Sequence, residues 1–187
     1  SALGRYLLRG VRHNVPFVRD VLRNDDFARG RTPTGFIGTH YPDGFSGARL
    51  SERERRELAA IATEVRRRRT ERTDGPRTAP SRGGGVDEDV VACLGGMFGD
   101  AYLVRSGGDS GDGVVACSVA RLAADGGDEA EAVTLSALEY EPSDDLARVK
   151  IAGESRAVQV HGDDEVGTLE LTMYGCDLDV LVMSPGE

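Results

Sequence analysis

The chain of 187 residues has no tryptophan, and phenylalanine and tyrosine together make up only 5% of it. Surfaces that stack bases or sugars depend on such side chains, so this class of binding protein is disfavoured. No apolar run reaches the roughly 18 residues that a membrane-spanning helix needs. No basic segment followed by an apolar stretch indicates a secretory signal either. We therefore expect a soluble protein of a reducing compartment that does not bind membranes.

Cysteine is scarce as well. Cys93, Cys117 and Cys176 are odd in number and lack the paired spacing of a disulfide framework or a zinc site. A folded chain of this size buries about 70% of its unfolded surface, so its core needs neither disulfides nor metals. We predict three free, mostly buried thiols.

Charge is distributed unevenly along the chain. The net charge is −9, but residues 1–85 carry +8 and residues 86–187 carry −17. Lys150 is the only lysine among the 23 basic residues. The first half could meet an acidic partner, whereas the second half is a poor surface for nucleic acid.

The first half has helical patterns. Asn14 as a cap, Pro16 near the start and apolar residues at helical spacing predict a helix over about 15–24. A stretch rich in glycine, proline and aromatics follows and is predicted to be an ordered connector. Ser51 and Glu54 then form a capping box, which starts a long amphipathic helix over 51–72. Its apolar stripe is Leu58, Ile61, Ala62 and Val65.

The second half has the period of β-strands. Apolar residues alternate with polar ones, for example at Val133, Leu135 and Ala137, and clusters of Gly and Asp separate the runs. Closure of such strands removes exposed edges, so we predict an α+β, mainly β fold in which a long helix packs with an eight-stranded antiparallel barrel. The predicted strands are 88–94, 101–105, 114–122, 132–140, 147–151, 156–160, 168–174 and 178–183.

Three patterns could indicate a catalytic or ligand-binding site, and each also has a purely structural interpretation. The string at residues 108–111 contains Ser110 in a protease-like Gly-Asp-Ser-Gly, but no histidine lies in a matching context, so an acidic turn is favoured. Arg66 to Arg69 could bind phosphates. Successive helical positions point about 100° apart, however, so a solvated helix end is the favoured interpretation. The acidic turns lack the ligand spacing of a calcium loop.

Longer motifs indicate a family. Residues 6–22 read Tyr-Leu-Leu-Arg-Gly-Val-Arg-His-Asn-Val-Pro-Phe-Val-Arg-Asp-Val-Leu, and Tyr41-Pro-Asp-Gly-Phe-Ser-Gly stands further on. Between them lie Phe27, Gly30, Thr34, Phe36 and Ile37. Residues 5–65 thereby resemble the alpha chains of biotin-dependent acyl-CoA carboxylases, and the propionyl-CoA carboxylases in particular. Downstream, the order of a helix, a loop and a barrel is similar to the BT domain of these alpha chains.

The resemblance implies a domain plan. Residues 1–49 correspond to the end of the biotin carboxylase domain and 50–187 to the BT domain, with a helix over 51–72, a hook loop over 73–85 and a barrel over 86–187. In the family, biotin, ATP and Mg²⁺ serve the parent enzyme, which is a ligase that converts propionyl-CoA to methylmalonyl-CoA. Lys150 lacks the flanking methionines of a biotin acceptor. We therefore expect no cofactor, metal or catalytic residue in this part.

The resemblance also implies a partner. The hook loop of the family contacts the carboxyltransferase beta subunit in a hetero-oligomer, which assigns contacts here to Pro76, Arg77, Pro80 and Arg82. The expected role is noncatalytic assembly, in the mitochondrial matrix or in bacterial cytoplasm. The alternatives are a nucleic-acid-binding barrel that uses the arginine-rich helix and a small hydrolase that uses Ser110.

Overall fold

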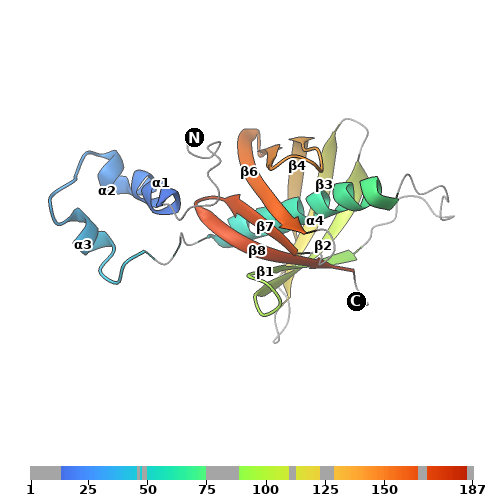
Figure 1. The fold of residues 1–187 in the computed structure, drawn as a ribbon, viewed down its shortest axis with the longest axis horizontal. Coiled ribbons are helices and arrows are strands. Elements are labelled where there is room, and N and C mark those ends of the chain that lie inside the picture. The colour runs from blue at the N-terminus through green and yellow to red at the C-terminus, as the bar shows by residue number, and fades with distance from the viewer. Residues whose placement is uncertain are drawn as a thin grey trace.

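The computed structural model describes residues 14–45, 47, 50–74, 89–109, 113–122, 129–163 and 168–184. Side chains are described for these residues except 71–74, 108, 109 and 163. Three short helices stand beside one end of a β-barrel, and a long helix runs through it (Figure 1). The predicted fold class, mainly β with a long helix and a closed antiparallel barrel, is confirmed.

Helix α1 spans Val15–Arg23 and has proline in its first positions. The predicted cap at Asn14 is wrong, because its side chain accepts no hydrogen bond from the helix start. Its backbone, with φ −102° and ψ 16°, lies outside the extended conformation that places a capping side chain. Asn24 caps the next helix instead, accepting from the amides of Asp26 at 2.9 Å and Phe27 at 3.3 Å.

The connector is ordered by aromatic contacts, as predicted. Helices α2 (Asp25–Ala28) and α3 (Phe36–His40) interrupt it. The Phe17 ring lies 5.0 Å from that of Tyr41 and 5.4 Å from that of Phe45, and these contacts link α1 to the chain before the long helix.

Helix α4 spans Glu52–Asp74 and begins at the predicted capping box. The Ser51 amide donates to Glu54 Oε2 at 2.9 Å, and the Glu54 amide donates to Ser51 Oγ at 3.3 Å. Two orphan amides at the helix start are thereby satisfied. The helix continues two residues beyond the predicted end at 72.

Eight antiparallel strands follow in sequence order, and the first pairs with the last to close the barrel. The predicted number and order of strands are correct, with shifts of a few residues at their ends. The strands are β1 (Asp89–Leu94), β2 (Asp100–Asp109), β3 (Val114–Leu122), β4 (Glu131–Glu139), β5 (Leu146–Ile151), β6 (Glu154–Asp163), β7 (Thr168–Met173) and β8 (Cys176–Met183).

Strand β4 contains a bulge that changes which side chains face inward. Its register with β5 shifts between Ser136 and Glu139, and Ala137 has a φ of 47°. Val133 and Leu135 are buried before the bulge, and Leu138 and Tyr140 are buried after it. The predicted inward position of Ala137 is therefore wrong, because one extra residue reverses the alternation.

Helix α4 lies inside the barrel rather than against its outer face. Every residue from Glu57 to Val65 is buried, and the helix contacts β1, β2, β3, β4, β7 and β8. The amphipathic interpretation is wrong in this respect, because the face opposite the apolar stripe is also covered. Strands surround the helix, so its polar side chains must find partners inside the protein.

Candidate functional site

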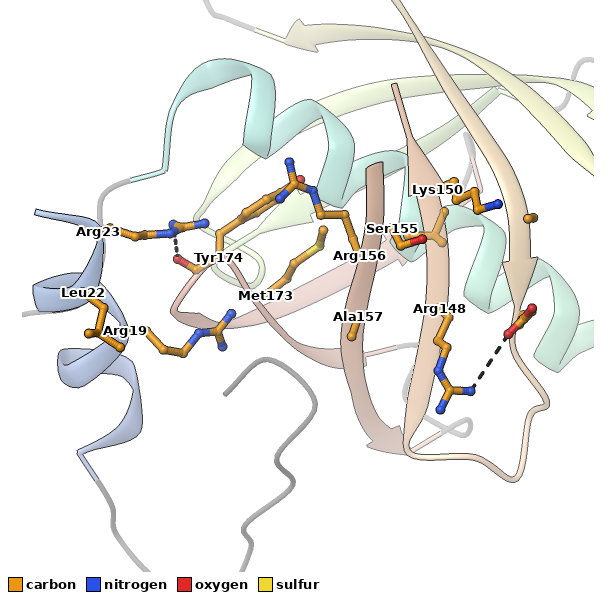
Figure 2. A pocket seen from close by; sticks show the side chains of 13 residues that line it. Arg19, Leu22, Arg23, Arg148, Lys150, Ser155, Arg156, Ala157, Met173 and Tyr174 are labelled. Carbon is orange, nitrogen blue, oxygen red and sulfur yellow. Dashed lines mark hydrogen bonds and ion pairs between the residues drawn. The ribbon is translucent and has the colours of Figure 1, made fainter. Parts of the chain in front are cut away.

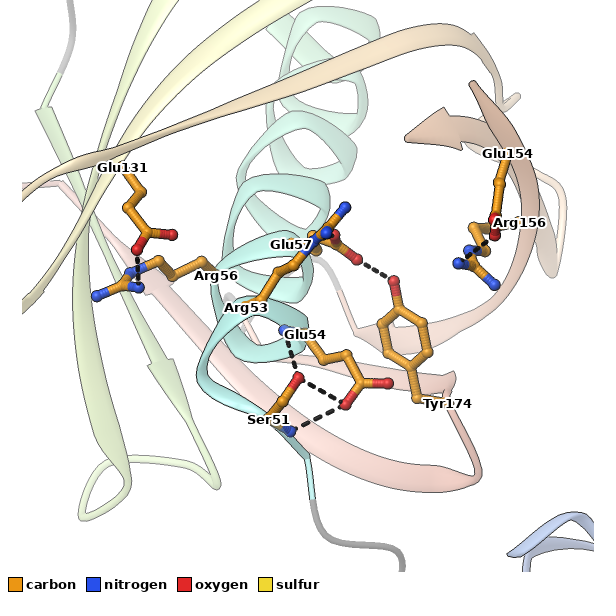
Figure 3. A network of polar contacts seen from close by, with 9 residues as sticks. All are labelled: Ser51, Arg53, Glu54, Arg56, Glu57, Glu131, Glu154, Arg156 and Tyr174. Carbon is orange, nitrogen blue, oxygen red and sulfur yellow. Dashed lines mark hydrogen bonds and ion pairs between the residues drawn. The ribbon is translucent and has the colours of Figure 1, made fainter. Parts of the chain in front are cut away.

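The polar network at the start of α4 joins the helix to the surrounding strands (Figure 3). Tyr174 Oη donates to Glu57 Oε2, and Arg53 Nε donates to Glu57 Oε1 at 2.9 Å. Burial raises the pKa of Tyr174, and its hydrogen bond to Glu57 raises it further. The Glu57 carboxylate is 7% exposed, so these two donors hold a nearly buried charge.

Two more helix arginines reach the strands at this end. Arg56, itself buried, places Nη1 2.9 Å from Glu131 Oε1 at the start of β4. Arg55 pairs with Asp100 at the start of β2, and Arg121 Nη2 lies 2.6 Å from the other oxygen of that carboxylate. The pairs therefore attach the helix to the starts of two strands, β2 and β4.

Near the middle of α4, a buried carboxylate organises the arginine run. Glu64 is 2% exposed and accepts from Arg67 Nη2 at 2.6 Å and from Arg68 Nε at 2.9 Å. Spacings of three and four residues bring these side chains together on the helix.

The last turns of α4 are tied to the barrel by the same run. Arg68 Nη1 donates to the Leu138 carbonyl at 3.0 Å, and Arg69 Nε donates to Tyr140 Oη at 2.6 Å. Arg69 is buried and also donates to the Gly162 carbonyl at 3.3 Å. The interpretation of these arginines as a solvated helix end is wrong for Arg69, which is buried, whereas Arg67 and Arg68 stay partly exposed, at 40% and 23%. They fix the depth at which α4 sits in the barrel.

The residues predicted to contact a partner cannot be placed. Pro76, Arg77, Pro80 and Arg82 lie outside the described part of the chain, as does Ser110. They remain predictions. The first four follow Asp74, the last residue of α4, in the sequence.

The cysteines and the possible metal ligands form no reactive or metal-binding cluster among the described residues. The three thiols are free and buried, as predicted, and burial raises the pKa of Cys117 to about 11. No group of three or more metal-ligating side chains occurs among the described residues. In the same part of the chain, no helix combines the length and hydrophobicity required to span a membrane.

A pocket of about 420 Å³ separates α1 from the outer side of β4, β5 and β6 (Figure 2). Five cationic side chains line it, together with one carboxylate, that of Glu139. We call it the cationic pocket; its basic residues are Arg19, Arg23, Arg148, Lys150 and Arg156.

Tyr174 anchors α1 to the barrel beside this pocket. Arg23 Nη1 donates to the Tyr174 carbonyl at 2.8 Å, and its guanidinium lies 5.7 Å from the centre of the ring. The Arg156 guanidinium lies at the same distance from that ring. Two cations therefore share one aromatic side chain, which contributes cation–π attraction but no neutralising charge.

Arg19 adds a third positive charge in this area. Burial lowers the pKa of its guanidinium, and repulsion from Arg23 lowers it further, although Asp177 opposes the change. Sequence reasoning missed the pocket. One signal was available, since three of the five basic residues in the acidic second half, Arg148, Lys150 and Arg156, lie within nine positions.

Comparison with known proteins agrees with this architecture. The family model for the propionyl-coenzyme A carboxylase BT domain matches residues 58–187, which include most of α4 and the entire barrel. The chain belongs to this family. The predicted resemblance to the alpha chains of propionyl-CoA carboxylases is confirmed at the level of the family.

Curated relatives match either a short part of this BT-domain chain or nearly all of it. The mitochondrial propionyl-CoA carboxylase alpha chains of Mus musculus and Homo sapiens are 47% and 42% identical over 65 residues, 35% of this chain and 9% of each relative. The propionyl-CoA carboxylase alpha chain of Ruegeria pomeroyi is 28% identical over 188 positions, 98% of this chain and 25% of the relative. The chain therefore spans between 9% and 25% of these relatives.

The single lysine does not fit attachment of biotin. Lys150 lies within β5 between the buried Val149 and Ile151, and its carbonyl accepts from Ser136 Oγ at 3.3 Å. A carrier lysine must swing between active sites, whereas this one belongs to a paired strand of a closed barrel. No step of biotin chemistry is assigned to this residue.

Proposed function

We propose that this chain is a noncatalytic assembly module that contacts the carboxyltransferase beta subunit of a propionyl-CoA carboxylase. Membership of the BT-domain family is the observation that carries the proposal. Residues 1–49 would be the end of a biotin carboxylase domain and residues 50–187 the BT domain. The module would hold two active sites within reach of one carrier, since effective concentration falls steeply when the geometry is wrong.

The way in which α4 is held in the barrel supports this role. Arg55 and Arg56 attach the start of the helix to β2 and β4, and Arg69 attaches its last turns to Tyr140. A helix fixed at both ends cannot slide, so it gives the segment after Asp74 a defined point of departure. Because α4 extends to Asp74, we assign the contact with the beta subunit to residues 75–85 of the predicted hook loop over 73–85, with Pro76, Arg77, Pro80 and Arg82 as its candidate residues.

The whole enzyme's chemistry belongs to this proposal as well. The parent would be a biotin-dependent ligase that carboxylates propionyl-CoA to methylmalonyl-CoA, with ATP, Mg²⁺ and biotin bound by other parts of the alpha chain. Its location would be the mitochondrial matrix, since the animal relatives are named mitochondrial, or bacterial cytoplasm, since the name of the relative from Ruegeria pomeroyi does not contain that word.

The nucleic-acid alternative loses its basis in the described residues. It required the arginines of α4 to face a phosphate backbone, but Arg67 and Arg68 pair with Glu64, and Arg69 is buried against Tyr140. Releasing them would leave the buried Glu64 carboxylate without its two donors. The hydrolase alternative rests on Ser110, which lies outside the described residues, and has no further support.

A binding assay tests the proposal. The chain is titrated with the beta subunit of a propionyl-CoA carboxylase, in parallel with a variant in which a Gly/Ser linker of equal length replaces residues 75–85. We expect binding by the chain and loss of binding by the linker variant, with unchanged far-ultraviolet circular dichroism and thermal transition. Binding that survives the replacement would move the contact elsewhere, and no binding by the folded chain would refute the assembly role.

A charge-matched pair of variants sharpens the result. Arg77→Ala with Arg82→Ala removes two charges from the proposed contact, whereas Arg29→Ala with Arg31→Ala removes two from the exposed chain around α2. The first pair should weaken binding at least about tenfold if the arginines are anchors of the contact. The second pair should leave the affinity within about twofold, because exposed charges outside a contact act only at long range.

A further inference from the structure

We propose that the cationic pocket between α1 and the barrel binds an organic phosphate that carries two or more negative charges. The pocket has a volume of about 420 Å³ and is lined by five basic side chains and one carboxylate. This role is separate from the contact proposed for residues 75–85.

The barrel side of the pocket owes its hollow to small residues. Arg148 and Lys150 alternate along the exposed face of β5. Their partners across the β6 ladder are Ala157 and Ser155, whose side chains are short. Long cationic side chains therefore border an open floor, and the Ser155 hydroxyl adds a hydrogen-bond donor within it (Figure 2).

Helix α1 supplies the facing wall. Arg19, Leu22 and Arg23 are three and four positions apart, so they share one helical face, and all three line the pocket. Two guanidiniums on α1 thus stand opposite the cations of β5 and β6. Like charges that face each other across a hollow repel, and an anion between them would turn this repulsion into attraction.

The carboxylates near the pocket compensate only part of this charge. Arg156 has a close partner in Glu154 at 2.6 Å. The pairs of Arg148 with Glu139 and of Arg23 with Glu54 are long, at 4.0 and 3.9 Å. Neither Arg19 nor Lys150 makes an ion pair with any residue that the structure describes.

One buried nitrogen strengthens the case for a missing acceptor. Arg156 Nε is buried and has no hydrogen-bond acceptor among the described residues. A buried donor without an acceptor is unfavourable, and a charged acceptor is the strongest remedy. Arg156 and Arg23 both lie 5.7 Å from the centre of the Tyr174 ring, and both line the pocket.

The lining favours an organic phosphate over a bare anion. Guanidinium groups match the geometry of phosphate oxygens, and several such groups require a ligand with more than one charge. The same walls expose apolar surface, since Leu22 is 49% exposed and Met173 and Ala157 also line the hollow. A nucleoside diphosphate carries charged phosphates for the guanidinium groups and an organic part for the apolar surface. Inorganic tripolyphosphate carries only the charged phosphates.

Calorimetric titration of the chain with ADP, and separately with tripolyphosphate, at about 0.15 M salt tests the proposal. We expect both probes to bind, with ADP the tighter of the two because its ring contacts the apolar wall. Binding of tripolyphosphate alone would overturn the organic part of the proposal. Absence of binding by both would overturn the site.

Two double variants with equal charge change separate a specific site from general attraction. Arg148→Gln with Lys150→Gln removes two exposed charges from the pocket, and Arg105→Gln with Arg121→Gln removes two from β2 and β3. The first pair should weaken ADP binding at least about tenfold, because hydrogen bonds to charged groups are lost. The second should change it less than about twofold. Equal weakening by both pairs would show that only the net charge matters and would overturn the proposal.

The part played by α1 needs its own variant. Arg19→Gln should weaken ADP binding by about tenfold while the thermal transition without ligand stays the same or rises, since it removes a charge that Arg23 repels. Unchanged ADP binding would restrict the site to the barrel and contradict the facing-wall arrangement.

A peptide of glutamates tests whether the pocket prefers a protein ligand. If this peptide displaces ADP at a lower concentration than tripolyphosphate does, the pocket binds an acidic protein segment instead of an organic phosphate.

Discussion

Arg69 in the last turns of α4 donates to the phenolic oxygen of Tyr140 at 2.6 Å, although the two residues lie 71 positions apart in the chain. The guanidinium also lies 5.9 Å from the centre of the Tyr140 ring. Tyr140 faces inward because the bulge at Ala137 reverses the alternation of β4. A local irregularity of one strand thus creates the acceptor that holds the end of the helix.

Removing the Tyr140 hydroxyl, which accepts from Arg69, should destabilise the fold. Tyr140→Phe leaves the buried Arg69 Nε without its partner, and we expect the free energy of unfolding to fall by about 1–3 kcal/mol. Urea unfolding measures the change. Tyr41→Phe is the matched control, because Tyr41 Oη donates to the half-buried Asp20 at 2.8 Å and its loss should cost less than about 1 kcal/mol. Equal losses in the two variants would contradict the role given to Tyr140.

The buried Glu64 carboxylate should matter more than any exposed acid. Glu64→Ala leaves Arg67 and Arg68 without their shared acceptor, and we expect a loss of about 3 kcal/mol in urea unfolding. Glu139→Ala, at a carboxylate that is 71% exposed, should cost less than about 1 kcal/mol. A Glu64→Ala protein as stable as the Glu139→Ala protein would show that the arginine run does not depend on this carboxylate.

The bulge can be tested by adding a branched side chain. Ala137→Val places a β-branched residue at a φ of 47°, where it is strained, and should lower the free energy of unfolding by about 1–3 kcal/mol. Ala132→Val, at an exposed position of the same strand, should be neutral. If the valine is tolerated equally at both positions, Ala137 does not adopt this conformation in solution.

Alkaline pH should weaken the fold through Cys117. Burial, followed in size by the negative charge of Glu64, raises the pKa of this thiol to about 11. An unfolded cysteine loses its proton near pH 8.5, so the unfolded state binds fewer protons between the two values. The stability that the neutral Cys117 thiol contributes is fully present below about pH 8.5, and it is lost as the pH rises through the folded pKa.

Urea unfolding at about pH 8 and about pH 10 measures this effect. The free energy of unfolding of the chain should fall between the two conditions, and Cys117→Ala should reduce the fall. Burial also raises the pKa of the Cys93 thiol, which contributes to the fall that remains, whereas buried tyrosines such as Tyr102, with a pKa raised to about 12, contribute mainly above about pH 10. A fall of the same size in the Cys117→Ala protein would contradict the raised thiol pKa.

Local patterns were enough to predict most of the elements. The capping box of Ser51 and Glu54 and the alternation in each strand depend on neighbours in the sequence, and the elements they predict are present. The order of strands also followed, because a meander pairs consecutive strands. Ala137 was misplaced because a bulge leaves no distinct signal when the residues on both sides remain apolar.

Long-range relationships could not be predicted in the same way. The charged residues of α4 have the composition of a solvated face, and only closure of the barrel around the helix buries Glu57 and Glu64. Nothing in the arginine run indicated Tyr140 as a partner. The cationic pocket combines side chains of α1 with those of β5 and β6, so it exists only once the segments are packed together.

Hydrogen exchange of the chain with and without the carboxyltransferase beta subunit tests the proposed contact between them. We expect amides within residues 75–85 to gain protection in the complex, while the strands of the barrel keep theirs. Protection that appears elsewhere and leaves residues 75–85 unchanged would contradict it.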